Sequence, residues 1–139
     1  MRNFFIILFA KILNVILKIA RKQGGNILGK IALKLNKNLL KDFKVNSPVT
    51  NNCIGYTLKQ AGFKVVSNSE GNNMETGIVS TLLKNCTLTG KIKADYICFE
   101  VDESYVPKIF SKFRLDTLVI LNFFRDQLDR NGEVETLIL

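Results

Sequence analysis

The stretch that decides the fold is A-D-Y-I-C-F-E-V-D-E-S, residues 94–104. Residues 95–101 within it are apolar at nearly every position and rich in β-formers, which is typical of a strand buried in a parallel sheet. Polar residues follow at once, from position 100 to 104. The stretch therefore predicts a parallel sheet with a polar edge.

The sequence around this strand alternates between helical and extended patterns. Helices are expected over residues 53–61, 74–83 and 103–113, the last with Pro107 near its first turns, where a missing N–H is tolerated. A turn into a strand is expected over 62–66, and another buried strand over 118–121. This alternation predicts an α/β fold with parallel strands and right-handed crossovers. Ligands of such sheets bind beyond the carboxyl ends of the strands.

Two polar clusters would lie at that edge. The first holds Glu100, Asp102 and Glu103, whose carboxylates could bind Mg²⁺ through oxygen ligands. The alternative is that these acids only begin the next helix, where they suit its dipole and free N–H groups. The second cluster spans residues 122–130, and its arginines and aspartates could equally form a surface ion-pair network.

Charge divides the chain near residue 44. The whole chain has a formal net charge of +8, but residues 1–44 carry +9 and residues 45–139 carry −1. This excludes a uniformly basic nucleic-acid coat, and only Phe is interleaved with the charges of the first part, so no nucleic-acid partner is expected. We predict a cationic arm, residues 1–44, on a near-neutral domain, residues 45–139.

Residues 4–20, F-F-I-I-L-F-A-K-I-L-N-V-I-L-K-I-A, form the most hydrophobic stretch. Helical spacing puts the polar residues here on one face, with apolar side chains around the rest of the helix. The polar residues are Lys11, Asn14, Lys18, Arg21 and Lys22. Three interpretations fit: a helix of residues 1–23 lying on an anionic membrane surface, a helix docked on the rest of the protein, and a signal peptide or membrane span. The lysines argue against the third.

A second basic helix is expected over residues 29–43, after a helix end at Gly24-Gly25. Its apolar stripe would be Ile31, Leu35, Leu39 and Phe43, with a lysine run opposite that is most simply a solvated face.

Cysteine and histidine usage limits the chemistry. The three cysteines, Cys53, Cys86 and Cys98, are widely spaced, and the chain has no histidine. No zinc site or disulfide framework is predicted, and histidine-dependent mechanisms are excluded. Buried thiols in a reducing cytoplasm are the simplest interpretation.

Several motifs in order resemble the Mur ligase superfamily, and more narrowly the MurT-like subunits of lipid II isoglutaminyl synthases of Gram-positive bacteria. The most specific are E-V-D-E-S and N-F-F-R-D-Q-L-D-R. The full series is G-K-I-A-L-K (29–34), K-Q-A-G-F-K-V-V-S-N (59–68), G-N-N-M-E-T-G-I (71–78), A-D-Y-I-C-F-E-V-D-E (94–103) and N-F-F-R-D-Q-L-D-R-N-G-E (122–133).

The resemblance implies a partial P-loop NTPase-like central domain with a parallel sheet, preceded by two basic helices. It implies an ATP- and magnesium-dependent ligase of peptidoglycan biosynthesis. Such a ligase activates the D-glutamate α-carboxyl of lipid II as an acyl phosphate, which ammonia from the glutaminase GatD converts to the amide. It also implies a cytoplasmic chain, attached peripherally at the inner face of the plasma membrane.

Site residues carry over by position. Glu100 matches the family's magnesium-binding glutamate, and Gln127 stands where many Mur ligases have a metal-binding histidine. Thr50 is expected to be a remnant of the phosphate-loop motif. No catalytic residue is assigned.

Two departures from the family weigh against activity. The family's phosphate loop, G-T-N-G-K-T-T, is replaced by F-K-V-N-S-P-V-T-N-N (43–52), with no glycine, no lysine followed by threonine, and no room for a preceding strand. The chain also stops at Leu139, before the rest of the central domain and the C-terminal domain. We therefore expect an inactive fragment; the alternative is a non-catalytic membrane-surface or protein-interaction module.

Overall fold

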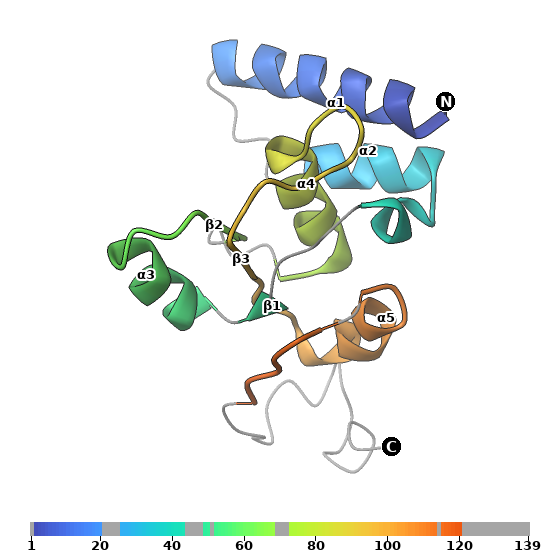
Figure 1. Cartoon of the computed structure of the whole chain (residues 1–139). Helices are drawn as coiled ribbons and strands as arrows, with labels where there is room; N and C mark the ends of the chain where they lie inside the picture. The colour runs from blue at the N-terminus through green and yellow to red at the C-terminus, as the bar shows by residue number, and fades with distance from the viewer. Residues whose placement is uncertain are drawn as a thin grey trace.

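A computed structural model of the chain describes residues 2–20, 26–43, 49–50, 52–68, 73–113 and 115–120. Within these residues three short strands form a sheet that helices cover on both sides (Figure 1). The elements in chain order are α1 Arg2–Ile19, α2 Ile27–Leu35, η1 Leu39–Asp42, β1 Val49–Thr50, α3 Asn52–Gln60, β2 Val65–Ser67, α4 Glu75–Asn85, β3 Tyr96–Cys98, η2 Glu103–Tyr105 and α5 Val106–Phe110.

The sheet has the order β1-β3-β2, with both pairs parallel. Ile97 of β3 lies opposite Val49 of β1 and Val66 of β2, so the strand predicted from residues 95–101 is the centre of the sheet. A parallel α/β arrangement is thereby confirmed. The helices predicted over 53–61 and 74–83 are α3 and α4, and the strand predicted after the turn at Gly62 is β2.

The two faces of the sheet bury different helices. Val66 and Ile97 point into the main core with α4, whose residues from Gly77 to Leu83 are all buried. On the opposite face Gly55 of α3 approaches so closely that an added Cβ would be 3.0 Å from the Cβ of Cys98. The period of two along each strand therefore separates an α4 face from an α3 face.

α1 and α2 form a second layer outside α4 (Figure 1). α2 crosses α4 at Gly29, and α1 packs on both helices through Ile6, Ile7 and Ala10. All these side chains belong to one continuous hydrophobic core with the sheet. The helix predicted over residues 4–20 is confirmed, while the Gly24-Gly25 ending lies outside the described residues.

The stripe predicted for the second helix is wrong in part. α2 ends at Leu35, and Asn36 adopts an extended conformation with φ −147° and ψ 101° before the short η1 begins. This break resets the helical phase, so α2 buries Leu28, Gly29 and Ala32 while Leu35 is 56% exposed. Leu39 and Phe43 are buried as predicted, but from η1 and the residue after it.

Two strand predictions are also corrected. A strand does precede α3, because Val49–Thr50 pairs with the free edge of β3, although the sequence indicated no room for one. Residues 118–120 form no strand, and Leu118 and Ile120 are 51% and 58% exposed. Leu121 lies outside the described residues. The helical prediction for 103–113 is confirmed over η2 and α5.

Candidate functional sites

The first candidate site is the carboxyl edge of the sheet, where Glu100 follows β3. The buried amide of Asn68, just after β2, holds the backbone of Glu100 from both sides. Its Oδ1 accepts a hydrogen bond from the Glu100 N–H at 2.9 Å, and its Nδ2 donates to the Glu100 carbonyl at 2.8 Å. Asn68 is only 2% exposed, whereas Glu100 is exposed. The amide thus continues the β2–β3 ladder and fixes the backbone of Glu100.

Asp102 has a structural partner set. Its Oδ1 accepts hydrogen bonds from the backbone N–H of Ser104, at 3.2 Å, and from the Ser104 hydroxyl. Its own N–H donates to the Asn73 carbonyl at 3.1 Å. These contacts match the alternative in which the acid begins the next helix. The side chain of Glu103 lies outside the described part, and no group of three metal-binding side chains occurs among the residues that are described.

Thr50 lies at the same edge of the sheet. It ends β1 opposite Cys98, two residues before Glu100, so the parallel topology brings the two predicted site residues to neighbouring strand ends. Only residue 51 separates β1 from α3. A phosphate-binding loop needs several backbone N–H groups around the anion, and one residue cannot supply them. The roles of Thr50 and Glu100 stay predictions, and the cluster at 122–130 with Gln127 lies outside the described residues.

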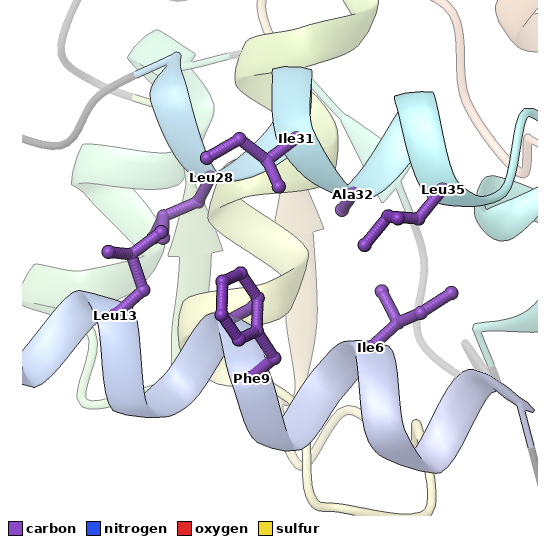
Figure 2. A pocket seen from close by; sticks show the side chains of 8 residues that line it. Ile6, Phe9, Leu13, Leu28, Ile31, Ala32 and Leu35 are labelled. Carbon is purple, nitrogen blue, oxygen red and sulfur yellow. The ribbon is translucent and has the colours of Figure 1, made fainter.

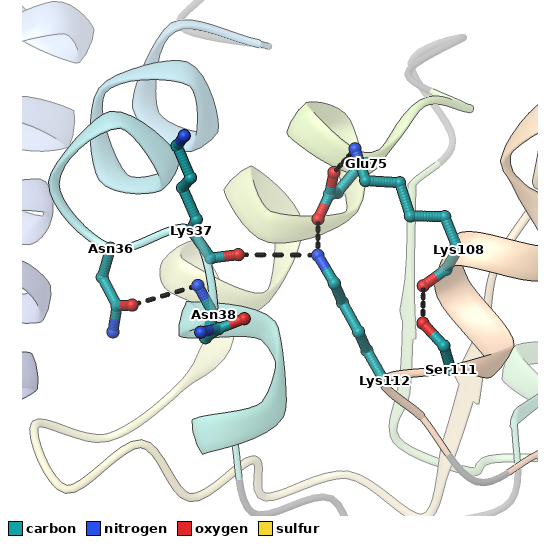
Figure 3. Close-up of polar contacts among 7 residues, drawn as sticks. All are labelled: Asn36, Lys37, Asn38, Glu75, Lys108, Ser111 and Lys112. Atoms are coloured by element: carbon teal, nitrogen blue, oxygen red, sulfur yellow. Dashed lines mark hydrogen bonds and ion pairs between the residues drawn. The ribbon is translucent and has the colours of Figure 1, made fainter.

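An ion-pair cluster that the sequence analysis does not predict surrounds Glu75, at the first turn of α4 (Figure 3). Glu75 is 6% exposed and pairs with Lys108, at 2.6 Å, and with Lys112. Burial acts to raise the pKa of Glu75, but hydrogen bonds and charge from Lys108 and Lys112 outweigh it and hold that pKa below its usual range. Lys112 also donates to the Lys37 carbonyl at 3.5 Å. The cluster joins α4, α5 and the turn after α2.

The second candidate site is the outer surface of α1. The docked-helix interpretation is confirmed for one side, where Ile6, Ile7 and Ala10 are buried. The other side is largely exposed and almost entirely apolar, and only Phe9 on it also borders α2. Its exposed side chains, between 43% and 78% accessible, are Phe4, Phe5, Phe9, Ile12, Val15, Ile16 and Ile19. Contiguous apolar surface of this extent is typical of a binding face.

Between α1 and α2 lies an apolar seam (Figure 2). Ile6, Phe9 and Leu13 reach into it from α1, opposite Leu28 and Ile31 of α2. The seam is too narrow to admit a water molecule, so it is packing and not a ligand cavity. Among the described helices none combines the length and apolar character that crossing a bilayer requires.

Comparison with known proteins supports the resemblance found in the motifs. The chain is 34% identical over 121 residues to the lipid II isoglutaminyl synthase (glutamine-hydrolyzing) subunit MurT of Staphylococcus aureus strain COL, which covers 87% of this chain. It is 33% identical to the MurT subunits of S. aureus strain N315 and Streptococcus pneumoniae strain R6, over 87% and 82% of this chain. The chain spans only 27–28% of the length of these relatives. No protein-family model and no solved structure matches.

Proposed function

We propose that this chain, a relative of MurT subunits over most of its own length, corresponds to part of the ligase subunit that amidates the D-glutamate of lipid II. The carrying observation is the 34% identity over 121 residues, joined to a parallel sheet with Glu100 at its carboxyl edge. In a complete enzyme of this type, ATP would activate the carboxyl group and a glutaminase would supply ammonia. The P-loop NTPase-like character of the domain is part of this proposal.

By itself the chain is not expected to bind ATP or form the amide. The residues present do not fit a triphosphate, because the β1–α3 connection is a single residue and residues 43–52 include no glycine. Glu100 is an exposed carboxylate that is suited to contacting magnesium, but one carboxylate is a weak site for that ion.

Calorimetric titration of the full chain with Mg·ATP tests this expectation. We expect no saturable binding at submillimolar nucleotide, and a micromolar affinity would overturn the prediction. The Glu100→Gln variant is the matched control, because any magnesium-dependent signal that survives this substitution does not come from Glu100. Phosphate release from the full chain, measured in parallel, should not exceed that of buffer.

A second function is favoured by the outer surface of α1: a non-catalytic module at the inner face of the plasma membrane, with residues 1–23 in contact with anionic lipid or with lipid II. Exposed Phe and Ile side chains beside Lys11 and Lys18 are the composition of an interfacial helix. Flotation of the full chain with phosphatidylglycerol vesicles tests it. Ile12→Gln with Ile19→Gln should reduce the floated fraction at least tenfold, and Tyr56→Gln, at an exposed apolar position of α3, should leave it unchanged. Equal flotation of all three chains would contradict the module.

The relatives are named as subunits, so they function within a complex. We propose a glutaminase of the GatD type as the partner of this chain also. Co-expression of the full chain with such a glutaminase, followed by affinity purification, tests the pairing. Retention of the chain at a 1:1 ratio is expected, and its absence from the eluate would contradict the proposal.

A further inference from the structure

The two sides of α1 have separate tasks in the structure. At 100° per residue, Ile6, Ile7 and Ala10 lie within one sector that faces α2 and α4, and they are 3–6% exposed. Ile12 and Ile19 lie on the opposite sector and are 53% and 78% exposed. A helix of this kind can contact a second surface without leaving the first. Docking on the protein and binding to a membrane are therefore compatible, not alternatives.

The apolar surface continues from α1 onto α2. Phe9 of α1 and Ile31 of α2 line the seam from opposite sides, as Figure 2 shows. α2 adds Leu35, which also lines the seam and is 56% exposed, and Ile27, which is 46% exposed. The exposed apolar area thus extends over both helices, from α1 across the seam to α2.

Lysines border this area on both sides. Lys11 and Lys18 lie on the flank of α1 that is remote from α2, and Lys30 and Lys34 lie on the exposed side of α2. The only acid in residues 1–44 is Asp42, whose carboxylate accepts hydrogen bonds from the side-chain amides of Asn3, at 2.8 Å, and Asn36, at 3.2 Å. An apolar strip between two cationic rows is complementary to a bilayer whose headgroups are anionic.

We propose that α1 and α2 together form one docking surface for an anionic phospholipid bilayer, and that α1 remains packed on α2 and α4 when the surface is occupied. The inference rests on the membrane association proposed above and adds the second helix and the intact packing. The apolar strip enters the acyl boundary while the lysine rows remain at phosphate level. In Figure 1 α1 lies at one end of the molecule and α5, just after the Glu100 edge, lies toward the other. The bound molecule therefore presents the sheet's carboxyl edge away from the bilayer.

Tryptophan fluorescence tests the extent of the surface, because the chain contains no Trp. Ile12→Trp on α1, Ile27→Trp on α2 and the control Tyr56→Trp on α3 each replace an exposed apolar residue. With vesicles of phosphatidylglycerol and brominated phosphatidylcholine, we expect quenching at positions 12 and 27 and none at 56. Quenching at 12 without quenching at 27 would overturn the two-helix surface and leave the association through residues 1–23 standing. Quenching at neither position would overturn both.

The role of the lysine rows is tested by removing two lysines from the proposed surface and, in a control, two lysines from another part of the chain. Lys30→Gln with Lys34→Gln should weaken vesicle binding roughly thirty-fold, at about fivefold for each lysine near the surface. The control, Lys59→Gln with Lys64→Gln, removes the same two charges from exposed positions, one in α3 and one after it. It should weaken vesicle binding less than threefold. Equal losses of vesicle binding in the two double variants would overturn the proposal that lysine rows border the apolar strip. Self-association of the lipid-free chain that Ile12→Gln abolishes would instead assign the face to a second copy and overturn the proposal.

The packing of α1 is tested through Cys86, which follows α4, is 4% exposed and belongs to the same buried cluster as Ile6 and Ile7 of α1. Labelling by a maleimide, followed site by site with mass spectrometry, reports whether this thiol becomes accessible. We expect the labelling rate of Cys86 on vesicles to stay within twofold of its rate in solution. A tenfold increase on vesicles, without unfolding seen by circular dichroism, would show that α1 detaches and would overturn the intact packing.

Discussion

Gly29 sets the distance between α2 and α4. Its N–H lies in the first turn of α2 and donates to the Ser80 hydroxyl of α4 at 2.7 Å, because Asn26 supplies no side-chain cap. A Cβ at this position would overlap the Thr76 carbonyl oxygen and lie 2.8 Å from the Ser80 Oγ. The backbone of α4 cannot move aside as a flexible side chain could. Glycine is therefore required here by close approach.

We predict that Gly29→Ala destabilises the protein by roughly 2 kcal/mol or more, even though alanine gains about 1 kcal/mol of helix propensity. Urea unfolding followed by circular dichroism measures the change in the free energy of unfolding. Lys30→Ala, at the next and exposed position, is the matched control and should change stability by less than about 0.5 kcal/mol. Equal stability of Gly29→Ala and the natural chain would contradict the crossing at Gly29.

Among single residues, Glu100 and Asn68 differ in how far the sequence predicts them. The apolar run before Glu100 predicts that this residue lies at the end of a strand, and in a parallel sheet that end belongs to the carboxyl edge. For Asn68 the sequence indicates only a polar residue after a short strand. Its role depends on the 2.8 and 2.9 Å contacts with a residue 32 positions away, and no local pattern encodes such a pairing.

At the scale of elements, Glu75 connects the first turn of α4 to α5. Its carboxylate receives both Lys108 and Lys112, so two lysines of the α5 region depend on one buried acid. Because the pKa of Glu75 is lowered in the folded protein, the unfolded chain takes up a proton more readily. The pair therefore contributes stability above the ordinary carboxyl pKa, and the contribution is lost as pH falls through the lower folded value.

We predict that Glu75→Gln lowers the free energy of unfolding by about 2 kcal/mol at pH 7, and that the difference from the natural chain shrinks steadily below about pH 4.5. Urea unfolding at pH 7, 5 and 3 measures it. Asp116→Asn, at an exposed acid after α5, is the control and should have little effect at pH 7. A deficit of Glu75→Gln that stayed constant down to pH 3 would contradict the ion-pair explanation.

Elements with a strong local pattern were predicted, and those created by neighbours were not. α3, α4 and β3 follow from helical or extended periodicity over several residues. β1 is only Val49–Thr50, and it is a strand because β3 offers an edge beside it. Residues 118–120 have the apolar composition of a strand but no sheet partner in the described chain, and Asn36 ends α2 through contacts with Asn3 and Asp42. Composition alone carries none of this information.

At the scale of the whole molecule, the charge boundary near residue 44 does not coincide with a gap in the packing. Ile7 and Ala10 of α1 share one core with Ile78 and Val79 of α4 and Ile97 of β3. The division into an arm of residues 1–44 and a domain of residues 45–139 stays a prediction that rests on charge and on the family resemblance. In the structure, α1 and α2 contribute buried side chains to the same core as α4 and the sheet. A mutation in α1 should therefore be felt by the sheet.

Ile7 and Ile12 test this cooperativity within one helix. Ile7 is 3% exposed and faces the core, while Ile12 is 53% exposed. We predict that Ile7→Ala costs about 2–4 kcal/mol of global stability through lost burial and a cavity, and that Ile12→Ala costs less than about 1 kcal/mol. Within each variant, far-ultraviolet circular dichroism and tyrosine fluorescence, to which Tyr96 of β3, Tyr56 and Tyr105 contribute, should report the same midpoint of urea unfolding. The opposite result would be that α1 unfolds first in Ile7→Ala while the tyrosine signal keeps the midpoint of the natural chain. The cationic arm would then be an independent appendage, and its packing on α4 would be too weak to persist on a membrane.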